Sequence, residues 1–317
     1  MKVYVRTPAR LHLGLIDMNG DLGRMFGGLG VCIDRPNVIL EAQHSKNFSI
    51  EGKEVELVNS IAQRFFSIYH QQPEVSIKVI ETIPPHVGLG SGTQLTLAVA
   101  VALAKLTGVK ASIPELAVTM GRAKRTSVGT TIFQSGGFVV DGGKNQKINC
   151  FPPLIYRQPF PKEWPFIVAI PNLKEGLSNS QENHAFQELT KMSASDVGQI
   201  CRLTMLKLLP GLAEKDIESF GDALTKIQVL TGNYFAQAQG GTYSSPVAAE
   251  CIDFMRKAGA YGVGQSSWGP AIYAIVKQQQ AKQMLAKVKA HLCKSVGGAV
   301  FVAKANNRGV TVKVVED

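Results

Sequence analysis

The stretch Ile83-Pro-Pro-His-Val-Gly88-Leu-Gly90-Ser91-Gly92-Thr93-Gln94 places three glycines in five residues directly before an apolar segment. Apolar residues from about Thr93 to Leu106, followed by Gly108 as a C-cap, predict a helix. Glycines let the backbone approach a ligand closely, and the N–H groups at a helix start favour an anion such as phosphate. We therefore expect a phosphate-binding loop formed by Gly88, Gly90, Ser91, Gly92 and Thr93. A glycine-rich turn with a Ser or Thr N-cap is the alternative.

This loop matches neither of the two common nucleotide motifs. No lysine follows Gly92, so the Walker A pattern is absent. The last glycine is also one residue too early for the dinucleotide pattern GxGxxG.

Upstream, the segment Pro8-Ala-Arg10-Leu-His12-Leu-Gly14-Leu-Ile-Asp17-Met-Asn-Gly20 groups polar side chains among small residues. We expect a strand at Val3 and Val5, a glycine-rich loop over 20–30 and a second strand over 38–41. His12 alternates with leucines, so its side chain should face away from theirs. The polar candidates for a site are Arg10, His12, Asp17, Asp21 and Arg24. A structural hydrogen bond is the alternative role for His12.

Two further segments carry candidate binding residues. Arg122, Lys124 and Arg125 place three cations within four residues, which could hold pyrophosphate or form a solvated helix end. The stretch Gly262–Pro270 contains Ser266, Ser267 and Trp268 between glycines. It suits a tight loop against a ligand or against another domain, or a simple turn.

The remaining pattern predicts an α+β protein with two domains, 1–155 and 156–317. Expected helices cover 54–70, 114–124, 180–192, 196–208, 214–230, 246–258 and 278–291. Expected strands cover 75–80, 166–170, 271–276, 300–303 and 309–315, and a strand-like segment lies within 133–141. A proline-rich stretch over 151–171 predicts a linker before the strand at 166.

Composition excludes several classes of protein. The chain has 317 residues, 45% of them apolar, which is too apolar for a disordered protein. Its longest apolar stretch is about half the roughly 20 residues that cross a membrane. Five cysteines without a CxxC pair predict reduced thiols and a cytoplasmic location. The net charge of +10 comes from dispersed residues without nucleic-acid motifs, so we expect no nucleic acid and no membrane. By itself the charge leaves two alternatives open, an anionic small-molecule substrate and a generally basic surface without a specific partner.

The order of three motifs, 8–20, 84–93 and 262–270, resembles the GHMP kinase superfamily over nearly the whole chain. Within it, five stretches resemble the β-ribofuranosylaminobenzene 5′-phosphate synthases. They are Arg10-Leu-His12, the segment 15–24, Gly27-Gly-Leu-Gly30, Gly136-Gly-Phe-Val-Val-Asp141-Gly and Ser266-Ser-Trp-Gly-Pro270. The resemblance implies an N-terminal domain like ribosomal protein S5 domain 2 and a C-terminal ferredoxin-like domain.

The resemblance also implies an activity. That family condenses phosphoribosyl pyrophosphate with 4-aminobenzoate or 4-hydroxybenzoate and releases CO2 and pyrophosphate, in methanopterin synthesis. The resemblance further implies Mg2+ as cofactor and a homodimer. The catalytic residues that it implies are Arg10, His12, Asp17 and Asp21. The substrate contacts that it implies come from Arg24, the phosphate loop, Lys124, Arg125, Gln134, Ser266, Ser267 and Trp268.

Two departures bear on the choice of activity. Gly129 stands where mevalonate-type kinases place an aspartate, and Gln134 stands where the synthases suggest an acidic residue, which puts a metal role there in doubt. An ATP-dependent small-molecule kinase and a non-catalytic ligand-binding protein are the alternatives.

Overall fold

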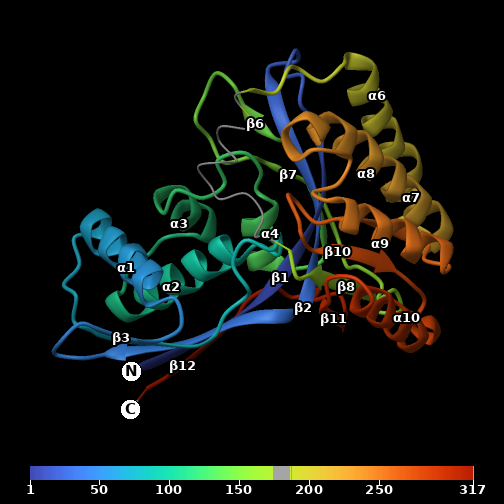
Figure 1. Cartoon of the computed structure of the whole chain (residues 1–317). Coiled ribbons are helices and arrows are strands. Elements are labelled where there is room, and N and C mark those ends of the chain that lie inside the picture. The colour runs from blue at the N-terminus through green and yellow to red at the C-terminus, as the bar shows by residue number, and fades with distance from the viewer. Residues whose placement is uncertain (174–185, 187, 317) are drawn as a thin grey trace.

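The computed structural model of the chain describes residues 1–173, 186 and 188–316, and these form two β-sheets covered by helices (Figure 1). The first sheet has the order β12-β1-β2-β4-β3, with β5 pairing to β2 and β7, and β6 pairing to β2. Its strands are β1 (Lys2–Asp17), β2 (Arg24–His44), β3 (Ser49–Gly52), β4 (Val75–Glu81), β5 (Phe138–Asp141), β6 (Lys144–Asn145), β7 (Leu154–Gln158) and β12 (Thr311–Val315).

Strands β1 and β2 form a long antiparallel hairpin that includes most of the glycines expected in a loop. The prediction of a loop over 20–30 is wrong from Arg24 onward, where β2 begins. A Cβ at Gly28 or Gly30 would lie 2.5 or 2.3 Å from the side chain of Val128. These glycines therefore serve close packing on the sheet, which is a common reason for glycine inside a strand.

Helices α1 (Val55–Tyr69), α2 (Ser91–Thr107), α3 (Ile113–Thr119) and α4 (Val128–Ser135) belong to the first half of the molecule (Figure 1). Nearly every residue of α2 is buried, because α2 packs against β1 and β2 on one side and against other helices elsewhere. The helix expected over 114–124 ends earlier, at Thr119, and Gly121 then takes a φ of +73°. The strand-like segment expected within 133–141 is confirmed as β5, and Phe133 lies in α4.

The second sheet has the order β11-β8-β10-β9, formed by β8 (Phe166–Pro171), β9 (Gly262–Gln265), β10 (Ile272–Ile275) and β11 (Gly298–Ala303). With α9 (Pro246–Lys257) and α10 (Ala281–Cys293), the chain order is β-α-β-β-α-β, which confirms the ferredoxin-like arrangement. The linker prediction over 151–171 is wrong in part, because β7 lies inside it.

The last strand, β12, returns to the first sheet and pairs with β1, so the two chain ends lie together (Figure 1). The expected boundary between residues 155 and 156 falls inside β7, and the division into 1–155 and 156–317 stays a prediction. Helix α8 (Ile217–Gln239) connects the sheets: Gln228 Nε2 donates to the Leu13 carbonyl of β1 (2.7 Å), and its Oε1 accepts from the Gln265 N–H of β9 (2.8 Å).

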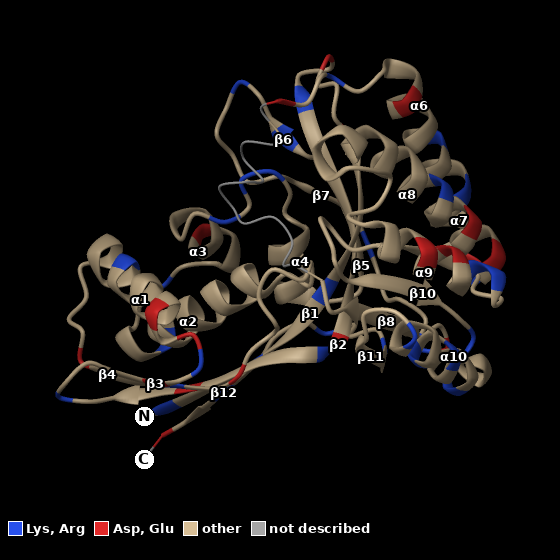
Figure 2. Cartoon of the chain, viewed as in Figure 1, with Lys and Arg blue, Asp and Glu red and all other residues tan. Residues whose placement is uncertain are grey.

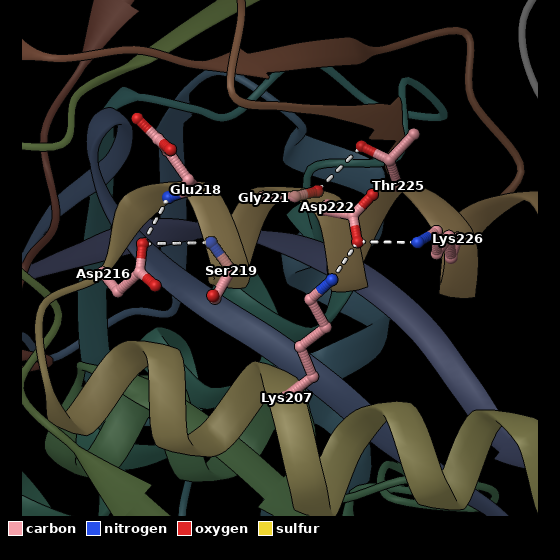
Figure 3. Close-up of polar contacts among 8 residues, drawn as sticks. All are labelled: Lys207, Asp216, Glu218, Ser219, Gly221, Asp222, Thr225 and Lys226. Atoms are coloured by element: carbon pink, nitrogen blue, oxygen red, sulfur yellow. Dashed lines mark hydrogen bonds and ion pairs between the residues drawn. The ribbon is translucent and has the colours of Figure 1, made fainter.

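Three further helical segments, α6 (Ala194–Leu203), a π-helical turn over Thr204–Leu208 and α7 (Leu209–Ala213), precede α8. Asp216 caps α8 by accepting the N–H groups of Glu218 and Ser219, and Asp222 pairs with Lys207 and Lys226 (Figure 3). These ion pairs are half-exposed, so each contributes at most about 1 kcal/mol.

The expected helix over 196–208 is confirmed as α6 and the π-helical turn, and the one over 214–230 extends to Gln239. The helix expected over 180–192 lies largely outside the described residues. No helix in the described part of the chain is both long enough and apolar enough to cross a membrane. All five cysteines are free thiols.

Candidate active site

A cavity of about 560 Å³ lies where the three sequence motifs meet. Its wall is formed by β1, the loop before α2, the segment 121–126, α8 and the turn after β9. Of the residues expected from sequence, the wall contains Arg10, His12, Gly88, Gly90, Ser91, Gly92, Thr93, Lys124, Arg125, Ser267 and Trp268.

The backbone carbonyl of Gly88, in the second motif, forms hydrogen bonds with side chains of the first and third motifs. It accepts hydrogen bonds from the Arg10 guanidinium and from the Ser266 hydroxyl, the latter at 2.7 Å. The same hydroxyl accepts the backbone N–H of His12 at 2.9 Å. Ser266 is buried behind the cavity wall, so its role is to hold the loop. Three segments far apart in sequence therefore determine the position of one oxygen atom.

The loop has the backbone of an anion site. Gly88 and Gly90 both have φ of +84°, which favours glycine, and Gly90 is the N-cap of α2. No side chain of the described residues caps α2. The N–H groups at its start are thus available to a ligand, as in other helix N-termini that bind phosphate. The Ser or Thr N-cap of the alternative is wrong, because Gly90 is the N-cap, and phosphate binding by the loop stays a prediction.

Positive charge dominates the cavity wall. Among the described residues, four cations line it, Arg10, Arg122, Lys124 and Arg125, against a single carboxylate, that of Glu54. Elsewhere, Lys and Arg are distributed over both halves of the chain, with Asp and Glu among them on the outer helices (Figure 2). The local excess of charge therefore suits a ligand with several negative charges.

Arg122 lines the cavity, and the sequence indicated it only as one member of the cationic cluster with Lys124 and Arg125. Its guanidinium donates to the Thr96 hydroxyl through Nε (3.1 Å) and Nη2 (2.8 Å). Thr96 in turn donates to the Gly92 carbonyl (2.6 Å), which connects Arg122 to the phosphate loop. Burial lowers the pKa of Arg122, because the charged form loses water.

His12 is neutral at physiological pH. Burial, followed by the nearby charge of Arg10, lowers the pKa of His12 to about 3. The imidazole can therefore orient a substrate or exchange a proton, but it is not a standing cation.

Besides Ser266, four expected residues lie outside the cavity wall, and the catalytic or binding roles of all five stay predictions. Asp17 Oδ1 accepts the N–H groups of Asn19 (2.7 Å) and Gly20 (2.9 Å), which closes a turn at the end of β1. Arg24 donates to the carbonyls of Gly142 (2.8 Å) and Gly143 (3.0 Å). The side chains of Asp21 and Gln134 are exposed.

Asp141 is a buried carboxylate that sequence reasoning did not assign to the site. It accepts backbone N–H groups from Gly28 (3.2 Å), Ser127 (2.8 Å), Val128 (3.2 Å) and Gly143 (2.9 Å). Burial raises its pKa to about 6, while these N–H groups oppose the rise. Asp141 thus anchors the start of α4, next to the wall segment 121–126. The sequence offered one indication of its importance, because Asp141 lies in the stretch 136–142 that resembles the synthases.

Comparison with known proteins defines the class. Two family models match, "GHMP kinases N terminal domain" over residues 56–136 and "GHMP kinases C terminal" over 208–292. The fold is similar to homoserine kinase from Cytophaga hutchinsonii, with a TM-score of 0.72 and 19% identity, covering 98% of this chain and 97% of that one. A mevalonate kinase structure matches with a TM-score of 0.70 and 14% identity, covering 96% and 99%. The chain thus has the GHMP kinase fold.

Sequence relatives define the branch. "Beta-ribofuranosylphenol 5′-phosphate synthase" of Methanothermobacter thermautotrophicus is 33% identical over 98% of both chains, and that of Archaeoglobus fulgidus is 34% identical over 98% and 99%. A homoserine kinase of Methanococcus maripaludis is 24% identical over 82% of this chain and 86% of its own. The chain therefore belongs to the β-ribofuranosylphenol 5′-phosphate synthase family of the GHMP superfamily, which confirms the resemblance seen in its motifs.

Proposed function

We propose that this protein condenses phosphoribosyl pyrophosphate with 4-hydroxybenzoate or 4-aminobenzoate to give a C-riboside, CO2 and pyrophosphate. The observation that carries this proposal is the cavity wall, where, within the described part of the chain, an uncapped glycine loop adjoins four cations and one carboxylate. Both substrates are anionic, and the first carries a phosphate and a pyrophosphate. Membership of a family whose named relatives are synthases, rather than kinases, supports the same reaction.

The wall fits the departure of pyrophosphate. As the bond between the ribosyl carbon and pyrophosphate breaks, negative charge grows on the leaving oxygen. Loop N–H groups and the side chains of Arg122, Lys124 and Arg125 can stabilise that charge without rearrangement. We expect the start of α2 and this cluster to hold the pyrophosphate together.

The second half of the reaction needs orientation more than chemical groups. The ring carbon that bears the carboxylate attacks the ribosyl carbon, and the positive charge left in the ring is delocalised by the para amino or hydroxyl group. Loss of CO2 returns its bonding electrons to the ring and restores aromaticity. The para oxygen or nitrogen would otherwise compete as nucleophile, so the protein must fix the angle of approach.

Mg2+ fits the wall only as an ion held largely by the substrate. No group of three His, Cys, Asp or Glu side chains that could bind a metal occurs in the described residues. The wall offers the hydroxyls of Ser91 and Thr93 and the carboxylate of Glu54. Mg2+ commonly keeps water and phosphate oxygens as ligands, and bound there it would neutralise part of the pyrophosphate charge. Ser91 is the residue we expect beside it.

The test is substrate labelled at the carboxyl carbon. Labelled CO2 should appear in step with pyrophosphate, and only with phosphoribosyl pyrophosphate and Mg2+ present. Pyrophosphate release with the label retained in the product would refute the proposal. Consumption of ATP with a hydroxyl acceptor would instead identify a kinase.

A thermal-shift comparison tests binding apart from turnover. Phosphoribosyl pyrophosphate at 100 times its dissociation constant should stabilise the protein by about 2.7 kcal/mol. ATP at the same concentration, each with Mg2+, should stabilise it less. Stabilisation by both ligands without any turnover would indicate a binding protein.

We propose a homodimer in the cytoplasm as the working form. Free cysteines at all five positions fit a reducing compartment. Light scattering on the eluted protein would measure the assembly, and a mass of one chain would overturn the dimer.

A further inference from the structure

One part of the cavity wall is aromatic. Phe186, Phe235 and Trp268 line it, and they come from three separate segments of the chain. The Phe235 and Trp268 ring centroids are 4.7 Å apart with planes at 64°. Phe186 lies 5.6 Å from each of them, at 89° and 82°. The rings thus pack edge to face, an arrangement that favours a further ring against the cluster. We call Phe235 and Trp268 the aromatic wall.

The aromatic wall differs from an ordinary core cluster in the exposure of Trp268, whereas Phe235 is buried at 8% exposure. The chain has two tryptophans, and Trp164 packs at 5% exposure against Phe160 and Phe220, away from the cavity wall. Trp268 is only partly buried and faces a space that a ligand can enter. An exposed aromatic surface inside a polar cavity is stabilised by a planar apolar ligand.

Two polar side chains, those of Arg125 and Gln239, lie near the aromatic residues in the cavity wall. The Arg125 guanidinium carbon lies 4.1 Å from the centroid of Phe186, which joins the rings to the cationic cluster. Gln239 follows Phe235 by one helical turn of α8 and also lines the cavity. Its Oε1 accepts from Gln265 Nε2 at 3.4 Å. The aromatic cluster therefore has a guanidinium and an amide among its neighbours in the cavity wall.

We propose that the aromatic wall is the binding site for the ring of the aromatic acid, with its carboxylate end toward Arg125 and its para group toward Gln239. The inference rests on the proposed function and deepens it by assigning the subsite of the second substrate. The carboxylate-bearing carbon then faces the ribosyl carbon at the pyrophosphate end. An amide both donates and accepts, so Gln239 suits a para amino group as well as a hydroxyl.

Kinetics of paired variants test the subsite. Trp268→Leu and Phe235→Leu should each raise the KM for 4-hydroxybenzoate about tenfold, equal to about 1.4 kcal/mol, with the KM for phosphoribosyl pyrophosphate unchanged. Trp268→Phe should keep most of the affinity because a ring remains. Tyr234→Leu is the matched control, since its ring packs 4.9 Å from Phe235 but does not line the cavity.

Binding without turnover separates this inference from the proposed function. Titration with 4-hydroxybenzoate should quench the tryptophan fluorescence of the Trp164→Phe variant and leave that of Trp268→Phe unchanged. If the C-riboside forms but Trp268→Leu leaves the KM for the aromatic acid unaltered, the subsite is overturned and the function stands. If quenching depends on Trp268 but no C-riboside forms, the subsite stands and the proposed function is overturned.

Discussion

Replacing Gly88 by alanine tests whether the meeting of the three motifs positions the phosphate loop. A Cβ there would lie 2.2 Å from the Ser266 carbonyl oxygen, whereas ordinary contacts begin near 3.4 Å. Both segments are backbone, so one of them must move by about 1 Å, which would separate the Gly88 carbonyl from Arg10 and the Ser266 hydroxyl. The φ of +84° adds strain of about 1–2 kcal/mol for a residue with a side chain.

Gly108 supplies the matched control at the other end of α2. Its φ is +72°, and a Cβ would meet nothing within 4 Å. Gly108→Ala should therefore lose about 1–2 kcal/mol of unfolding free energy in urea titrations, and Gly88→Ala should lose more, because its Cβ also meets backbone atoms. Gly88→Ala should in addition lower kcat/KM for labelled CO2 release about 100-fold, because a shift of about 1 Å in a positioning element has that effect. Equal kinetics for the two variants would refute the role given to this contact.

Three other variants address the charged groups. Arg125→Ala should lower kcat/KM by roughly 10- to 150-fold, the loss of a charge-assisted contact of about 1.5–3 kcal/mol, while Lys147→Ala, at an exposed position, should not. His12→Gln should remove a pH dependence of stability. The pKa of His12 is about 3 in the folded state and about 6.5 in the unfolded state, so the unfolded state binds more protons between these pH values. The free energy of unfolding therefore rises with pH in that range, by up to about 1.4 kcal/mol per pH unit. Matching urea midpoints of variant and parent across that range would contradict this. Asp141→Ala should lower the unfolding free energy by at least about 3 kcal/mol, since four backbone N–H groups lose their acceptor. Asp253→Ala, at an exposed ion pair, should lower the unfolding free energy far less, and a similar loss for both variants would show that Asp141 does not anchor α4.

Local features of the site could be predicted because each depends on neighbours in the sequence. Glycines at 88, 90 and 92 before an apolar run specify an uncapped helix start wherever the segment lies in the fold. Arg122, Lys124 and Arg125 form a cationic cluster in any conformation of so short a segment. In the second half, helices α8, α9 and α10 and strands β8, β10, β11 and β12 were predicted near their observed bounds, except that α8 extends to Gln239. The loop expected over 262–270 is wrong at its start, because Gly262–Gln265 pairs with β10 as strand β9.

Other features depend on packing between distant segments. The stretch from Arg24 to Gly30 has the composition of a loop, yet it is a strand because Val128 needs the space that Gly28 and Gly30 leave. The stretch 136–142 singles out Asp141 by its family resemblance alone, and the neighbours of Asp141 in sequence do not reveal its hydrogen-bond partners. Only the tertiary structure turns four backbone N–H groups toward it.

The sequence by itself determined the class of fold, the phosphate loop and the cationic cluster, because backbone preference, hydrophobic period and charge are properties of short segments. The tertiary structure alone decided which of the candidates share a cavity. It left Asp17 in a turn and brought Phe235 and Trp268 together as one wall. It also joined Arg10, Gly88 and Ser266 at one carbonyl oxygen. The physical reason is that contacts between distant segments arise from the packing of two sheets and α8, which no short segment encodes.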